Sequence, residues 1–226
     1  MAKGKLIVIE GLDGSGKATQ TGLLCRSLAE EWGHSFRRVS FPDYQDPSSA
    51  LVKLYLAGEL GGLSEVNAYG ASLFYTVDRY ASYLRHWGED YRRGWLIVSD
   101  RYATSNVAHQ MSKLPRGEWD GYLRWLEETE YLRVGLPRPD RVVYLDMAPE
   151  TSERLLSRRY QGDESKKDLH EADLAYLLKC REAALYGAER LGWVVLPCCS
   201  GGDPYPPEEI AKKVWQAVQP VLKGDS

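Results

Sequence analysis

The chain has 226 residues, of which 43% are hydrophobic, and its 29 Lys and Arg against 32 Asp and Glu give a formal net charge of −3. This length fits one domain, and since no linker rich in Pro, Ser or Gly divides it, we expect a single domain over residues 1–226. The lack of a basic excess argues against a nucleic-acid polymer as partner, and apolar runs of only strand length exclude a membrane span. The N-terminal Met-Ala-Lys-Gly-Lys leads directly into a strand without room for a signal peptide, so we expect a cytoplasmic protein.

The first predicted element is a strand at residues 6–9, which leads into a glycine-rich loop. Residues 11–19 match the pattern G-x-x-x-x-G-K-[ST] at Gly11, Gly16 and Lys17, but Ala18 stands where a Ser or Thr hydroxyl normally contacts Mg²⁺. Glycines let successive backbone N–H groups point into one concavity at a helix N-terminus, where they bind phosphate oxygens, and the lysine adds a positive charge. A helix predicted at 17–32 follows, as the pattern requires, and favours this interpretation over a flexible glycine turn. The residues expected to bind a nucleoside triphosphate are Gly11, Leu12, Asp13, Gly14, Ser15, Gly16, Lys17, Ala18 and Thr19.

The remaining predicted elements alternate between strands and helices. Further strands are expected at 36–41, 95–99, 141–146 and 193–197, and helices at 48–58, 64–92, 119–131, 150–159, 171–191 and 207–222. Strands that are apolar over nearly their whole length are typical of a sheet covered on both faces, although Arg37 and Arg38 weaken the assignment at 36–41. The alternation predicts an α/β fold with a doubly wound, five-stranded parallel sheet and helices on both faces.

A polar segment, SRRYQGDESKK at residues 157–167, lies between two predicted helices. One interpretation is a mobile, charged lid at about 157–168. The other is a solvated loop with no special role, which charge content alone favours.

Three of the predicted strands end in residues that suit phosphate chemistry. The first leads to the loop that contains Asp13, the second to Phe41-Pro42-Asp43-Tyr44 and the third to Asp100-Arg101-Tyr102. Ligands of open parallel sheets bind at the carboxyl ends of the strands. Because phosphoryl transfer depends mainly on positioning and on neutralising oxygen charge, this set indicates a phosphotransferase.

Several motifs in this order resemble the thymidylate kinase family, a group of P-loop nucleoside monophosphate kinases. They are GLDGSGKATQ, FPDY, LFYTVDR, SDRYATSNVAHQ, PRPDRVVYLD and the DLHE that ends the predicted lid, and the resemblance covers about residues 5–215. It implies a fold like that of P-loop NTPases, with ATP bound at residues 11–19 together with Mg²⁺. It also implies transfer of the γ-phosphoryl group to dTMP, giving dTDP and ADP, and a homodimer.

The resemblance assigns roles to four residues around the acceptor nucleotide. Asp13 matches an acidic residue that approaches the sugar 3′-hydroxyl and the transfer site, and Arg101 matches an arginine that clamps the monophosphate. Tyr75 and Arg79, which share one helix face, match a ring that stacks on thymine and an arginine that reaches a thymine carbonyl. Without the resemblance, Tyr75 would be assigned to the core.

Further positions complete the implied acceptor site. Asn106 and Gln110, on the helical turns after Asp100-Arg101-Tyr102, match polar positions around the base and loop; the alternative is a solvated helix face. Phe41 and Pro42 match a Phe-Pro pair at the nucleotide-facing end of the second strand, and Leu56 is a candidate for a wall beside the base; the alternative for these three is ordinary packing. His109 stands where many relatives have tyrosine near the sugar, which leaves the selection of deoxyribose open. Tyr44 stands where some relatives have an arginine that contacts the monophosphate, so we expect Arg101 to make more of the contacts with that phosphate.

The catalytic cation and the metal need separate assignments. Because Gly14 replaces the loop arginine of some relatives, we expect the lid to supply the cation through Arg158 or Arg159, with Arg154 a further candidate. Without a hydroxyl at position 18, Mg²⁺ is expected to be held by phosphates, waters and, indirectly, Asp100, with Thr19 a further candidate for the missing hydroxyl. The four cysteines lack metal-ligand spacing, so we expect free thiols.

Two alternatives to a dTMP kinase stay open. One is a kinase of another nucleoside monophosphate or small metabolite. The other is a nucleotide-binding regulatory protein whose catalysis is impaired by Ala18.

The aromatic-rich stretch at 69–87 supplies either a dimer face or core packing.

Overall fold

Five parallel strands form the centre of the molecule. The computed structural model describes residues 3–62, 65–159 and 174–224. The strands are β1 (Lys5–Gly11), β2 (Phe36–Ser40), β3 (Leu96–Asp100), β4 (Arg141–Asp146) and β5 (Val194–Pro197), in the sheet order β2-β3-β1-β4-β5. The predicted five-stranded parallel sheet is therefore confirmed, including its weakest strand, β2, which pairs with β3 from Phe36 to Ser40.

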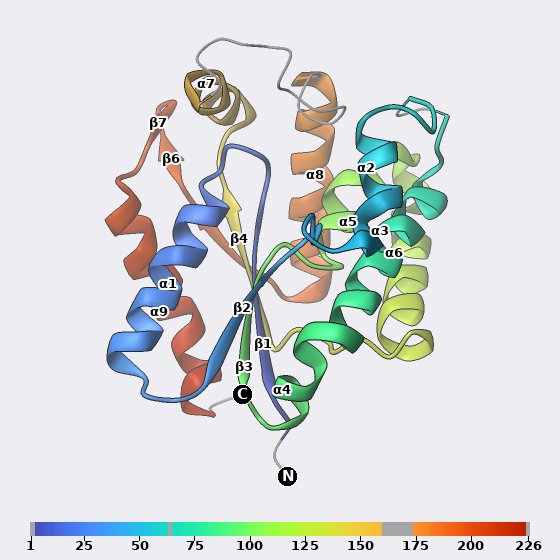
Figure 1. Ribbon diagram of the computed structural model, residues 1–226. Coiled ribbons are helices and arrows are strands. Elements are labelled where there is room, and N and C mark those ends of the chain that lie inside the picture. The colour runs from blue at the N-terminus through green and yellow to red at the C-terminus, as the bar shows by residue number, and fades with distance from the viewer. Residues whose placement is uncertain (1–2, 63–64, 160–173, 225–226) are drawn as a thin grey trace.

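Helices cover both faces of the sheet (Figure 1). On one face lie α1 (Lys17–Glu31) and α9 (Pro207–Lys223); on the other lie α3 (Ala68–Ser82), α5 (Ser105–His109), α6 (Trp119–Glu127) and α8 (Leu174–Leu191). The remaining helices of the described residues are α2 (Ala50–Leu56), α4 (Gly88–Arg92) and α7 (Pro149–Arg159), and a small hairpin joins β6 (Cys199–Ser200) to β7 (Asp203–Pro204). Every helix in the described part of the chain is too short or too polar to cross a membrane.

Alternate residues of β1 point into two separate cores. Ile7 and Ile9 pack with buried residues of α1 and α9, whereas Leu6 and Val8 pack with Trp87 and its neighbours on the opposite face. All four β1 side chains are fully buried. A strand enclosed in this way is apolar at every position, which explains the continuous hydrophobic pattern of its sequence.

The structure divides the predicted helix at 64–92 into three pieces. It begins at Ala68, since Asn67 caps α3 by accepting a hydrogen bond from the N–H of Gly70. A π-helical turn, Tyr83–Trp87, then separates α3 from α4. A second π-helical turn, Glu128–Arg133, extends α6. Helix α5 contains Asn106, which was expected on a helical turn, whereas the β6–β7 hairpin has no counterpart in the predicted elements. The predicted lid begins within α7, and its residues 160–168 lie outside the described part of the chain.

Candidate functional site

A cavity of about 690 Å³ opens at the carboxyl ends of β1, β2 and β3. The predicted site residues that line it are Asp13, Gly14, Gly16, Lys17, Ala18, Thr19, Phe41, Pro42, Leu56, Tyr75, Arg79, Asp100, Arg101, Asn106, His109 and Gln110. Gly11, Leu12 and Ser15 belong to the same loop but do not line the cavity. The sheet thus brings together residues that lie far apart in the sequence.

The glycine-rich loop joins β1 to α1 beneath the first turns of α7. Gly14 has a φ of 80°, and a Cβ at this position would lie 2.5 Å from the carbonyl oxygen of Ser152 in α7. A larger residue is therefore excluded at position 14 both by backbone conformation and by the approach of α7. Lys17 is 7% exposed, and its Nζ donates to the carbonyl of Leu12 at 2.9 Å.

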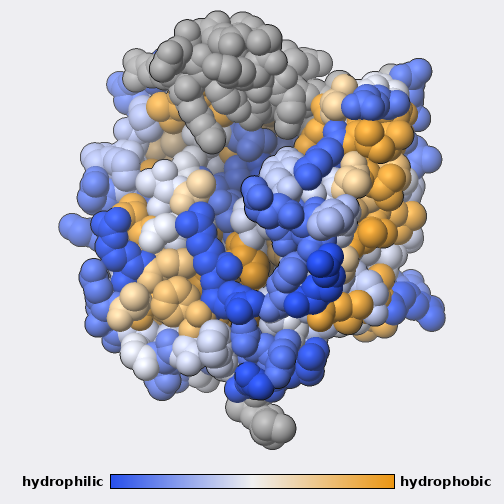
Figure 2. All heavy atoms as spheres, in the orientation of Figure 1, coloured by the Kyte–Doolittle hydropathy of each residue, from blue (hydrophilic) through white to orange (hydrophobic). Residues whose placement is uncertain are grey.

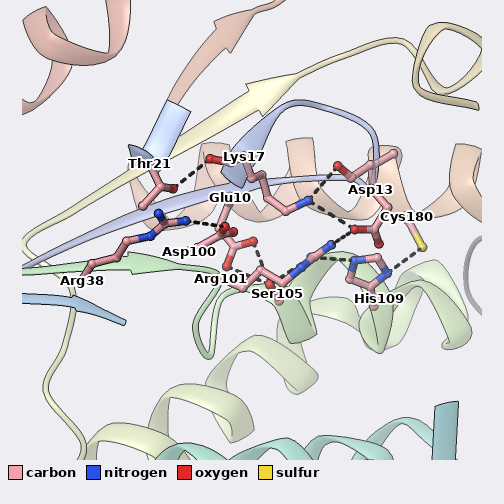
Figure 3. A network of polar contacts seen from close by, with 11 residues as sticks. Glu10, Asp13, Lys17, Thr21, Arg38, Asp100, Arg101, Ser105, His109 and Cys180 are labelled. Carbon is pink, nitrogen blue, oxygen red and sulfur yellow. Dashed lines mark hydrogen bonds and ion pairs between the residues drawn. The ribbon is translucent and has the colours of Figure 1, made fainter. Parts of the chain in front are cut away.

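Asp13 lies at the centre of a charged network between the loop and β3 (Figure 3). Arg101 donates from Nη2 to Asp13 Oδ1, and Lys17 Nζ lies 3.5 Å from the same oxygen. Arg101 Nη1 is also 3.2 Å from Nε2 of His109. Burial opposes the charged form of Asp13, but the positive charges of Arg101 and Lys17 outweigh it and hold the pKa of Asp13 well below its usual range. Asp100 also lines the cavity, so the charged groups around the loop and the end of β3 are two cations, Lys17 and Arg101, and two carboxylates, Asp13 and Asp100.

Glu10, at the carboxyl end of β1, supports the turn that carries Arg101. Its carboxylate accepts hydrogen bonds from the backbone N–H of Tyr102 at 3.1 Å, from Thr104 Oγ1 at 2.6 Å and from Ser105 Oγ at 2.8 Å. Burial raises the pKa of Glu10, against the opposing charge of Arg101. Sequence reasoning missed this residue, although a charged side chain inside an otherwise apolar strand is a signal for a buried polar contact.

The cavity is also lined by buried amide groups that lack hydrogen-bond partners among the described residues. Gln110 is fully buried, and within the described part of the chain neither its Oε1 nor its Nε2 has a hydrogen-bond partner. Asn106 Nδ2 is likewise unpaired among the described residues. Arg79, only 1% exposed, forms an ion pair with Glu130, a second residue that the sequence analysis missed. Because an unsatisfied buried polar group costs about 1–3 kcal/mol, these amides indicate a ligand that supplies their partners.

Arg154 points away from this cavity, toward the β6–β7 hairpin. Its Nη2 donates to the carbonyl of Gly202 at 2.5 Å and lies 3.5 Å from Asp203 Oδ1. Thr151 also donates to Gly202 O, at 2.8 Å. The first turns of α7 are thereby tied to the hairpin, and Arg154 is not among the cavity residues. The side chains of Arg158 and Arg159 lie outside the described part of the structure.

Comparison with known proteins identifies the family. The family model described as thymidylate kinase matches residues 9–197. The chain belongs to the thymidylate kinase family. It is 30% identical to the thymidylate kinase of Mycobacterium tuberculosis over 184 residues, which cover 80% of this chain and 83% of that one. The human thymidylate kinase is 31% identical over 145 residues, or 64% of this chain and 62% of that one.

The fold agrees with a solved member of the thymidylate kinase family. The structure of the Candida albicans thymidylate kinase superposes with a TM-score of 0.70 at 22% identity, covering 100% of this chain and 95% of that one. This likeness shows the P-loop NTPase-like fold. Membership of the thymidylate kinase family makes the chain a kinase.

The cavity also contains a carboxylate that suits Mg²⁺ as a ligand. Asp100, 7% exposed, lines the cavity close to Ala18, because Nη2 of Arg38 lies 3.9 Å from Asp100 Oδ2 and 3.5 Å from Ala18 O. Among the described residues, no group of three or more His, Cys, Asp or Glu is arranged to hold a metal ion. Mg²⁺ commonly binds through one or two carboxylates, with substrate phosphates and waters as its other ligands. Asp100 and the open loop therefore fit a metal that arrives with a nucleotide.

Proposed function

We propose that the protein transfers the γ-phosphoryl group of ATP to dTMP, giving dTDP and ADP for dTTP synthesis. The observation that carries the proposal is the combination of groups that line one cavity. Lys17, Arg101 and the backbone N–H groups of the phosphate-binding loop suit phosphates, whereas the unpaired amides and the ion-paired Arg79 suit a neutral base. This combination fits an acceptor nucleotide whose phosphate points at the phosphate-binding loop.

At the loop end, residues 11–19 would hold the ATP phosphates. Backbone N–H groups at the start of α1 and Nζ of Lys17 supply the positive potential. Arg101 has a planar guanidinium that suits two oxygens of the acceptor monophosphate. The guanidinium of Arg101 holds the Asp13 carboxylate in place. Asp13 would face the acceptor sugar near its 3′-hydroxyl, as its match in the family implies.

At the base end, the hydrogen-bonding groups match a pyrimidine imide. Thymine presents two carbonyl oxygens with an N–H between them. Arg79 can only donate hydrogen bonds, whereas the amides of Gln110 and Asn106 both donate and accept. Tyr75 lines the same cavity and would stack on the base, and Phe41, Pro42 and Leu56 would form its apolar walls.

Mg²⁺ would be held by Asp100 through water and by the nucleotide phosphates, since Ala18 has no hydroxyl. When bound, the metal neutralises phosphate charge. The protein's own contribution is to align donor and acceptor and to exclude water. We propose that the lid at about 157–168 excludes water and that its Arg158 or Arg159 supplies the catalytic cation.

A coupled assay tests the proposal. ADP formation from ATP and Mg²⁺ is measured with dTMP, dUMP, dCMP, dGMP and UMP as acceptors. The Candida albicans thymidylate kinase is described as having broad substrate specificity, so the whole panel is needed here. We expect the highest kcat/KM with dTMP; a higher value with any other acceptor would contradict the substrate assignment.

A second candidate function follows from Ala18, namely a nucleotide-binding regulatory protein with impaired catalysis. It predicts ATP binding without turnover of any acceptor. The presence of Lys17, Asp13, Asp100 and Arg101 around one cavity favours the kinase.

A further inference from the structure

Glu130 lies directly behind Arg79 and outside the cavity. It belongs to the π-helical turn Glu128–Arg133, and its side chain is 0% exposed. Arg79 donates from Nε to Glu130 Oε2 at 3.3 Å and from Nη2 to Oε1. Thr76, one helical turn before Arg79, donates to the same Oε1 at 2.7 Å. Three donors from α3 thus fix the carboxylate in one orientation.

This contact leaves a defined part of the guanidinium for a ligand. An arginine side chain has five N–H donors in a rigid plane, and Glu130 accepts from Nε and Nη2. Within the described part of the chain, Nη1 makes no hydrogen bond. Because Arg79 lines the cavity and Glu130 does not, the carboxylate holds one edge of the guanidinium and leaves the other edge for the base.

Glu130 also decides the charge of this end of the cavity. Burial disfavours a charged Arg79, but the carboxylate outweighs it, so the pKa of the guanidinium is raised and the side chain stays protonated. The pair is neutral as a whole. Arg101 and Lys17 line the same cavity, together with the carboxylates of Asp13 and Asp100. With Glu130 in place, Arg79 adds no net positive charge that would attract the phosphate of a nucleotide to the base position.

Stability alone does not explain the pair. Well-packed apolar residues in place of a buried ion pair are often equally stable or more stable, because both charges must be desolvated. A buried Arg and Glu with one free guanidinium edge at a cavity are better explained by recognition of a ligand.

We propose that Glu130 is a positioning residue for the acceptor base. It fixes and neutralises Arg79 so that Nη1 donates to a carbonyl oxygen, which favours a base with a carbonyl over one with an amino group at that point. The inference rests on the proposed dTMP kinase function and names how that site selects its pyrimidine.

The test compares Glu130→Gln with Glu128→Gln. Both residues lie in the same π-helical turn, but Glu128 pairs with Arg133 at the exposed surface. For Glu130→Gln we expect the KM for dTMP to rise about tenfold or more, the KM for ATP to stay within about twofold, and kcat to change less than the KM for dTMP. The ratio of kcat/KM for dTMP to that for dCMP should fall about tenfold, and inorganic phosphate should compete with dTMP at lower concentration. Glu128→Gln should behave as the wild type.

Two further measurements keep the outcome decisive. Calorimetric titration with dTMP and dCMP reports base selection independently of phosphoryl transfer. If Glu130→Gln does not fold, Thr76→Val removes a single donor to Oε1 and should produce a smaller loss of the same selectivity. If the wild type prefers dTMP and a folded Glu130→Gln keeps both the full preference and the wild-type KM, this inference alone is overturned. A wild type that neither phosphorylates nor binds dTMP would overturn the proposed function and this inference with it.

Discussion

Arg101 combines an unusual backbone conformation with a fixed side chain. Its φ of 65° lies in the left-handed region, which costs a non-glycine residue about 1–3 kcal/mol. The N–H of Arg101 donates to the carbonyl of Ile9 at 3.1 Å, and the next N–H, of Tyr102, donates to buried Glu10. These bonds hold the turn in place, so the guanidinium of Arg101 is already positioned beside Asp13 before a ligand binds. A strained residue retained at a cavity in this way supports a direct role for Arg101 in binding.

The pH dependence of folding should reveal the environment of Asp13. Its pKa is held below the usual range in the folded protein, so its stabilising contribution is present above about pH 4 and is lost as the pH falls further. We expect the free energy of unfolding of Asp13→Asn to fall less steeply than that of the wild type between about pH 5 and pH 2. Urea titrations across this range measure it, with an unchanged m-value as the control for comparable unfolding. Parallel curves for the two proteins would contradict the charge network.

Ala18→Ser tests how Mg²⁺ is held. The added hydroxyl can reach a metal bound to the nucleotide phosphates, so the Mg²⁺ concentration for half-maximal rate should fall a few-fold, with little change in the maximal rate. Ala18→Cys is the matched control, because a thiol of similar volume is a poor ligand for Mg²⁺ and should leave the wild-type requirement in place. A serine variant that rises from almost no activity to rapid turnover would instead support the impaired regulatory protein.

Among the elements, α5 depends on the close approach of α8. Asn106 and His109 of α5 line the cavity, and a Cβ at Gly187 of α8 would lie 2.3 Å from Val107 Cγ1. Gly187→Ala should therefore force the helices apart, lower the stability by about 1–3 kcal/mol and raise the KM for the acceptor. Thermal unfolding measures the first effect. Gly121→Ala in α6, where a Cβ would meet nothing within 4 Å, is the control and should match or exceed the wild-type Tm. Equal Tm values for the two variants would show that α5 and α8 are not tightly coupled.

The elements that the sequence predicted are those with a strong local pattern. Apart from β2, the strands are apolar over most of their length, and the phosphate-binding loop has fixed glycines. Helical turns around Asn106 were expected from the motif before them, but the five residues of α5 are too few for a helical period to set its bounds. The two π-helical turns depend on packing rather than on a local signal.

The motifs named many of the residues that line the cavity, and the roles assigned to them stay predictions. The buried residues behind the cavity, Glu10 and Glu130, were not named. Their importance follows from burial and from partners distant in sequence, such as Thr104 and Arg79, and neither is visible in a single chain.

At the scale of the whole molecule, the strand order explains how the site is assembled. With the order β2-β3-β1-β4-β5, the loops after β1 and β3 emerge side by side, and the loop after β2 lies next to them. Asp13 and Arg101 are 88 residues apart in sequence, yet they form an ion pair. Because parallel strands all end at one edge, residues that follow successive strands meet there without any local sequence signal for their contact.

The molecule also leaves an apolar face on α3 and the turn after it. Leu73, Val77, Tyr80 and Leu84 are 46%, 50%, 39% and 59% exposed, and their spacing places them on one side of the helical segment. In Figure 2, hydrophobic residues gather on the side where Figure 1 shows α2, α3 and α6. We propose that a second copy of the chain covers this face, as the family resemblance implies.

Val77→Glu tests the dimer, because it places an unpaired charge in the middle of the apolar face. Burying such a charge is strongly unfavourable, so the variant should sediment as a monomer at concentrations where the wild type is a dimer. Gln216→Glu adds the same charge on α9, on the opposite face of the sheet, and should remain dimeric. Sedimentation velocity at micromolar concentration measures all three proteins. A monomeric wild type would contradict the dimer itself. A dimeric Val77→Glu would show that the interface lies elsewhere, because an ionised carboxylate at the centre of a dry apolar contact has no partner to offset its desolvation.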